Sequence, residues 1–93
     1  MTGAIKRFQI RFYGRVQGVG FRCTAYHLAQ GSGLTGWIEN EFDGTVLCEV
    51  QGERVLIDEF LGKLHNSRYI RIDDMDIKEL ALVESERSFD IRG

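Results

Sequence analysis

The chain has 93 residues, 43% hydrophobic and 28% charged, which is the composition of one small globular domain. No stretch contains the roughly 20 apolar residues of a membrane-spanning helix, and no apolar signal segment follows the N-terminus. We therefore expect a single domain over residues 1–93, located in the cytoplasm, without a membrane partner and with no need for more than a monomer.

Charge is distributed unevenly along the chain, around a net value of −2. Residues 1–38 contain five basic side chains and no acidic one, whereas residues 39–93 contain all 14 carboxylates and the other seven basic residues. An acidic chain lacks the domain-wide positive field that attracts nucleic acid, but its N-terminal third is suited to a local anion site. A small anion is therefore the expected ligand, and nucleic acid is not an expected partner.

The first half of the chain predicts one strand, one helix and a hairpin. Residues 6–13 alternate between polar and apolar side chains, as in a half-buried strand. A loop with three glycines covers residues 14–20, and apolar side chains then recur at helical spacing over residues 21–31. Residues 34–40 and 45–51 predict two more strands, joined by a turn that carries an Asp-Gly signal.

The second half predicts a helix and two further strands. The clearest helical stripe runs over residues 53–65. Residues 69–82 are strand-like, but their apolar parity changes between Ile72 and Met75, which predicts a bulge at Asp73-Asp74. The alternation around Phe89 marks a short last strand.

The predicted order is therefore β-α-β-β-α-β-β. We expect an α+β sandwich of ferredoxin-like plan, with two helices on one face of a mainly antiparallel five-stranded sheet. That plan is found in enzymes, RNA binders and small-ligand sensors, so it assigns no function by itself.

Cysteine and histidine give no pattern for chemistry. Cys23 and Cys48 are too few for a disulfide framework and have no metal-binding spacing, and His27 and His65 lie on separate predicted helices. Cys48 alternates with apolar neighbours and is expected in the core, whereas Cys23 and His27 lie away from the apolar stripe of their helix. We expect no metal site and no cofactor.

The segment from Gly14 to Arg22 is the most informative in the chain. Gly18 and Gly20 allow backbone conformations that other residues avoid, so successive N–H groups can point at one ligand at the positive end of the next helix. Arg22 lies in the first helical turn, where its guanidinium can reach the same ligand. The segment matches neither a P-loop nor a dinucleotide fingerprint, and an ordinary glycine-rich connection is the alternative interpretation.

Asn40 ends a predicted strand just before the hairpin turn. Its amide both donates and accepts hydrogen bonds, which suits it to orient a water molecule. Asparagine is also common at the start of a turn, and that role is the alternative.

Together the two segments resemble the acylphosphatase family. The family motif Gly-x-Val-Gln-Gly-Val-x-Phe-Arg stands without a gap at residues 14–22, and a second motif is spread over Gly36-Trp37, Asn40, Gly44-x-Val46 and Gly52. The resemblance continues to the closing Phe89-Asp-Ile-Arg92 and so covers nearly the whole chain.

The resemblance implies hydrolysis of the carboxyl–phosphate bond of acyl phosphates. It places the catalytic arginine at Arg22 and the catalytic asparagine at Asn40. The phosphate-binding segment then comprises Arg15, Val16, Gln17, Gly18, Val19, Gly20, Phe21 and Arg22. An acyl phosphate is the implied substrate, with inorganic phosphate or sulfate as product or inhibitor.

The chain departs from the family pattern at several positions. Glu39 and Ile38 stand where a basic or amide residue and a small residue are usual, the chain has no proline, and residues 65–72 replace a loop that contains glycine and proline. Strand alternation turns Glu39 to the face opposite Asn40, so its charge should affect the site little.

The chemistry implied by the resemblance needs few side chains. The leaving carboxylate is stable near neutral pH without a general acid, so holding the phosphoryl charge and aiming one water are sufficient. No side chain is an obvious base for that water, and our hypothesis is that the substrate phosphate accepts its proton.

Two other functions are open to the sequence. One is a phosphate or carbamoyl-phosphate binding domain without turnover. The other is an RNA-recognition module that stacks bases on Phe8, Phe12, Tyr13 or Trp37, although the RNP1 pattern is absent and Phe8 and Phe12 share a core-facing parity.

Overall fold

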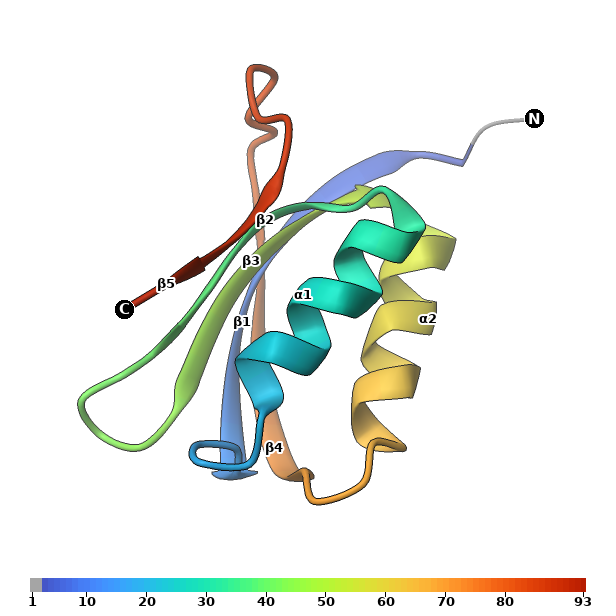
Figure 1. Ribbon diagram of the computed structural model, residues 1–93. Coiled ribbons are helices and arrows are strands. Elements are labelled where there is room, and N and C mark those ends of the chain that lie inside the picture. The colour runs from blue at the N-terminus through green and yellow to red at the C-terminus, as the bar shows by residue number, and fades with distance from the viewer. Residues whose placement is uncertain (1–2) are drawn as a thin grey trace.

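The computed structural model describes residues 3–93 and shows two helices packed on one face of a five-stranded sheet (Figure 1). The sheet order is β4-β1-β3-β2-β5. The elements, in chain order, are β1 (Ile5–Arg15), α1 (Phe21–Ser32), β2 (Thr35–Asn40), β3 (Val46–Glu53), α2 (Arg54–His65), β4 (Arg71–Leu80) and β5 (Phe89–Arg92). The predicted fold class and order of elements are confirmed.

The sheet is antiparallel except at one edge. β1 lies between β3 and β4 and pairs with both in antiparallel register, whereas β5 pairs in parallel with β2. The register of β1 against β4 shifts where Tyr13 faces Asp74 and Gly14 faces Ile72, which leaves Asp73 as the extra residue and confirms the predicted bulge. Gly14 is required there, because a Cβ atom would lie 2.3 Å from the carbonyl oxygen of Arg71.

The core lies between the sheet and the helices. Phe8, Ile10 and Phe12 of β1 point into it, as the alternation predicted, and Cys48 of β3 is fully buried there. Burial in this apolar layer raises the pKa of the Cys48 thiol, so the thiol stays protonated and inert. With Phe8 and Phe12 buried, two of the aromatic side chains considered for base stacking are not available to RNA.

The other face of the sheet is polar, and part of it is covered by the connection between β4 and β5. The Arg7 side chain on this face is 3% exposed and makes ion pairs of 2.9 Å with Glu49 and 2.7 Å with Glu86. Burial lowers the pKa of Arg7, but the hydrogen bonds from Glu86 and Glu49 outweigh this effect and raise it overall. Glu86 thereby fastens the connection that leads into β5. Within residues 3–93, no helix has the length and apolar character needed to cross a membrane.

Candidate active site

The loop of residues 16–20 connects β1 to α1 and takes its shape from two glycines. Gly18 and Gly20 have φ angles of 72° and 78°, in the left-handed region that glycine enters without strain. No atom lies within 4 Å of the position a Cβ atom would take at either residue. Glycine is therefore needed at these two positions for its backbone conformation and not for lack of space. The space above the loop is open to a ligand.

Both ends of this loop are held in the core. Val16 and Phe21 are 1% and 2% exposed. The Phe21 ring at the start of α1 packs against Phe12 of β1, with 4.9 Å between the ring centroids. Between these anchors, the side-chain amide of Gln17 donates hydrogen bonds of 2.8 Å to the carbonyl oxygens of Glu41 and Thr45. Gln17 thus fixes the loop relative to the hairpin that follows Asn40.

The loop ends on a helix N-terminus that can accept an anion. Gly20 is the N-cap of α1 and provides no side-chain cap, and the first turn contains no acidic residue. The N–H groups of Gln17, Gly18, Val19 and Gly20 donate no hydrogen bond to any group within residues 3–93. Unpaired backbone donors at the positive end of a helix are a binding site for a phosphate-sized anion.

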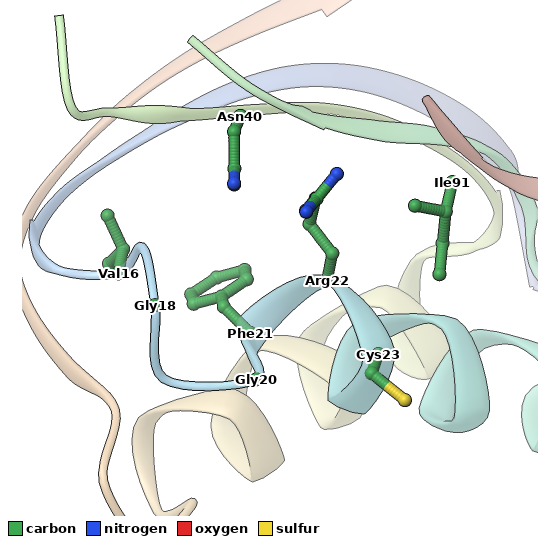
Figure 2. Close-up of a pocket in the computed structure, with 8 residues that line it drawn as sticks. All are labelled: Val16, Gly18, Gly20, Phe21, Arg22, Cys23, Asn40 and Ile91. Carbon is green, nitrogen blue, oxygen red and sulfur yellow. The ribbon is translucent and has the colours of Figure 1, made fainter. Parts of the chain in front are cut away.

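Arg22 rises from the first turn of α1 toward β2 (Figure 2). Its Nη1 donates hydrogen bonds of 3.2 Å and 2.8 Å to the backbone oxygens of Arg92 and Gly93, at the end of β5. These contacts hold one side of the guanidinium. The Nε and Nη2 groups make no hydrogen bond within the part of the chain that the structure describes, so this edge can present two parallel donors.

Asn40 and Arg22 face the same hollow from different elements. Figure 2 shows the Asn40 side chain pointing from the end of β2 toward the loop, across from Arg22. The hollow measures about 240 Å³, and its lining residues are Val16, Gly18, Gly20, Phe21, Arg22, Cys23, Asn40 and Ile91. No His, Asp or Glu of residues 3–93 lines it, and the Cys23 sulfur points away from Asn40 (Figure 2). The described residues also hold no cluster of three potential metal ligands.

Comparison with known proteins identifies the family of this chain. The model of the family described as acylphosphatase matches residues 8–91. The chain belongs to the acylphosphatase family. It is 36% identical over 90 residues to an acylphosphatase of Oceanobacillus iheyensis, over 95% of this chain and 99% of that one. It is 38% identical over 88 residues to an acylphosphatase of Clostridium acetobutylicum, over 94% and 97% of the two chains.

Solved structures agree with the family assignment. The crystal structure of an acylphosphatase from Bacillus subtilis superposes with a TM-score of 0.87 at 30% identity, covering 97% of this chain and all of the other. An acylphosphatase from Coxiella burnetii gives a TM-score of 0.84 at 28% identity, over 95% and 93% of the two chains. The family named from the sequence motifs, its fold and its enzyme class are therefore confirmed.

The structure of this acylphosphatase brings some of the expected site residues together and separates others. Gly18, Gly20, Arg22 and Asn40 share the hollow, whereas Val16 and Phe21 contribute buried side chains to its floor. Arg15 and Val19 do not line this hollow, and the Gln17 side chain is occupied by the hairpin.

Glu39 lies outside the hollow, as strand alternation predicted. It sits on the polar face of β2, and its hydrogen bond with Glu41 raises the pKa of its carboxyl, an effect that desolvation reinforces and Arg92 opposes. The acid therefore stays off the anion-binding side of the strand.

Sequence reasoning missed two contributors at the end of the chain. Ile91 lines the hollow, and the Arg92 and Gly93 oxygens hold Arg22. The position of Ile91 could have been predicted from strand alternation, because Phe89 is buried and Ile91 lies on the same face of the strand. No local sequence pattern predicted that the Arg92 and Gly93 oxygens hold Arg22.

Proposed function

We propose that this acylphosphatase binds the phosphoryl group between the 16–20 loop and Arg22, and hydrolyses it with a water molecule oriented by Asn40. Family membership supplies the reaction, which converts an acyl phosphate and water into a carboxylate and inorganic phosphate. The observation that carries the residue roles is the single hollow that Gly18, Gly20, Arg22 and Asn40 line together.

The binding step uses donors that have no other partner. Backbone N–H groups of the loop and of the first turn of α1 donate hydrogen bonds to the phosphoryl oxygens, and the free edge of Arg22 donates to two of these oxygens. The oxygens of Arg92 and Gly93 keep the guanidinium plane fixed while it does so. Such preorganised donors stabilise the charge that spreads over the equatorial oxygens in the transition state.

The chemical step is a displacement at phosphorus. The Asn40 amide accepts a hydrogen bond from the water and directs its lone pair at the phosphorus atom. As the new P–O bond forms, the bond between phosphorus and the acyl oxygen breaks, and its electrons leave with the carboxylate. The water's proton passes to a phosphoryl oxygen of the substrate. The absence of His, Asp and Glu from the described lining supports this route, because no protein carboxylate or imidazole is within the hollow to take the proton.

Hydrolysis of benzoyl phosphate tests this proposal directly. We expect release of phosphate, competitive inhibition by inorganic phosphate, and a kcat that shows no enzyme group titrating near neutral pH. A protein that binds phosphate tightly but releases none from benzoyl phosphate would instead be a phosphate-binding domain. A kcat governed by a group with a pKa near 7 would contradict the role given to the substrate phosphate.

A single domain over residues 1–93, a monomeric state, a location in the cytoplasm, independence from metals and the lack of a nucleic-acid partner stay predictions from the sequence. The phosphate-binding role of residues 15–22 likewise stays a proposal, tested by the variants described below.

A further inference from the structure

A second hollow lies beside the phosphate loop. It measures about 360 Å³ and is lined by Arg15, Gly18, Val19 and Tyr69. Gly18 therefore lines both hollows, whereas Asn40 lines only the first. Figure 1 shows the 16–20 loop and the connection between α2 and β4, which carries Tyr69, at the same end of the molecule. A ligand held over Gly18 can extend from one hollow into the other.

Tyr69 has a backbone conformation that residues other than glycine rarely adopt. Its φ angle is 73°, and within residues 3–93 it is the one residue other than glycine with a positive φ. A side chain in this region costs on the order of 1–2 kcal/mol. Tyr69 is 74% exposed, so burial in the core does not offset that cost. Strain of this kind is concentrated at binding and catalytic sites.

The side chains around this hollow suit a flat, unsaturated group. The Arg68 guanidinium lies 5.9 Å from the centroid of the Tyr69 ring and covers one of its faces, which leaves the other face for a ligand. Arg15 makes no ion pair or side-chain hydrogen bond within the described part of the chain, and its planar guanidinium also stacks on aromatic rings. One ring and one guanidinium thus border the same space.

The direction of the displacement points the acyl group toward this space. Attack from the Asn40 side requires the leaving oxygen on the opposite side of the phosphorus, because the attacking and leaving oxygens are roughly in line. The second hollow shares Gly18 with the first and is not lined by Asn40, so an acyl group that departs across Gly18, away from Asn40, would enter it.

We propose that the hollow bordered by Tyr69 and Arg15 is the acyl-binding subsite, and that the Tyr69 ring selects substrates with an aromatic acyl group. This inference rests on the proposed function, since it takes the water to come from Asn40. It assigns a role to part of the 65–72 segment, in which this chain departs from the family pattern.

The test compares kcat/KM for benzoyl phosphate with kcat/KM for acetyl phosphate, which lacks a ring. In Tyr69→Gly we expect the benzoyl value to fall about five-fold, the loss of one aromatic contact, while the acetyl value stays unchanged. Tyr69→Phe should keep the wild-type ratio, because it keeps the ring. Glycine also relieves the positive φ, so Tyr69→Gly should melt at or above the wild-type temperature, which separates a lost contact from a lost fold.

Val55→Ala is the control, since Val55 is an exposed side chain on α2 that does not line either hollow. An unchanged benzoyl-to-acetyl ratio in Tyr69→Gly, or an equal change in Val55→Ala, would overturn the subsite. A lowered benzoyl-to-acetyl ratio of kcat/KM in Tyr69→Phe would show that stacking on the ring is not the basis of the selectivity. If the wild-type protein hydrolyses neither substrate, the proposed function fails; if it hydrolyses both and only the ratio test fails, the subsite alone is wrong.

Discussion

Asn40 is placed by strand alternation on the same face as the buried Ile38, and this face looks onto the phosphate loop. Replacing it with alanine removes the group that orients the water and leaves the anion donors intact. We therefore expect Asn40→Ala to lower kcat by about 10²–10³-fold, the usual cost of one transition-state hydrogen bond. Steady-state kinetics with benzoyl phosphate measure this loss, and the inhibition constant for inorganic phosphate should change less than about two-fold.

Asn66→Ala is a matched control, because Asn66 is the C-cap residue of α2 and does not line the hollow. It should keep its kcat. Turnover above half of the wild-type value in folded Asn40→Ala would assign Asn40 to the turn instead.

Arg22 has a geometry that lysine cannot reproduce. Its Nη1 is tied to the Arg92 and Gly93 oxygens, which leaves a planar pair of donors for the phosphoryl group, whereas lysine offers one mobile ammonium. We expect Arg22→Ala to weaken phosphate inhibition and to lower kcat, and Arg22→Lys to recover part of the inhibition but little of the rate. A loss of about 3 kcal/mol in transition-state stabilisation is the scale expected for lysine.

The measurement is kcat/KM for benzoyl phosphate together with the phosphate inhibition constant of each variant. Arg87→Lys, at an exposed position outside the hollow, should match the wild-type protein in both. Full turnover in Arg22→Lys would show that Arg22 supplies charge alone.

The phosphate loop and the β2–β3 hairpin act as one unit because Gln17 joins them. Its amide donates to two backbone oxygens, those of Glu41 and Thr45, each at 2.8 Å. Gln17→Ala leaves both acceptors without this donor and should cost about 2 kcal/mol of folding free energy. Because the loop then moves relative to Asn40, we expect kcat/KM to fall as well, by about ten-fold or more.

Denaturant unfolding and kinetics check the two effects separately. Gln17→Glu should be the more damaging change, since a carboxylate cannot donate to carbonyl oxygens and repels them. Gln9→Ala is the control: Gln9 also donates a side-chain hydrogen bond, to Glu49 on the far face of the sheet, so it should change stability without changing kcat/KM. Unchanged kinetics in Gln17→Ala would reduce Gln17 to a structural contact.

The whole molecule should gain stability from an anion that fits the loop. Inorganic phosphate binds the folded chain and not the unfolded one, so at 100 times its dissociation constant it should add about 2.7 kcal/mol to the free energy of unfolding. Chloride at the same ionic strength should add far less, because its effect is general screening. Thermal melts in the two salts measure the difference.

The Arg22→Ala variant locates this effect. Its melting temperature should respond much less to phosphate than that of the wild-type protein, since one of the phosphate's partners is gone. Equal rises in phosphate and chloride would show that no specific anion site exists in the loop.

Periodicity determined the elements and their faces. The two-residue period of β1, the helical stripe of α2 and the parity change at Asp73 each reappear in the structure, because these patterns record which face of a local segment avoids water. Glycine positions likewise marked the loop, since Gly18 and Gly20 meet a conformational requirement that no other residue meets without strain. Arg22 and Asn40 were identified from the motif alone, and the fold places both at one hollow.

Tertiary structure decided which distant segments meet, and sequence periodicity carries no information about that. The burial of Arg7 depends on Glu86, 79 residues away, and the orientation of Arg22 depends on oxygens at the end of β5. The sequence placed Gln17 in the phosphate-binding segment, but only the folded chain shows that its side chain donates to two backbone oxygens of the hairpin. The φ angle of Tyr69 lies in a region that residues other than glycine rarely adopt, so its local preference does not predict it. The periodicity of each segment predicts its own secondary structure but not its contacts with distant segments. Only the folded chain determines these features.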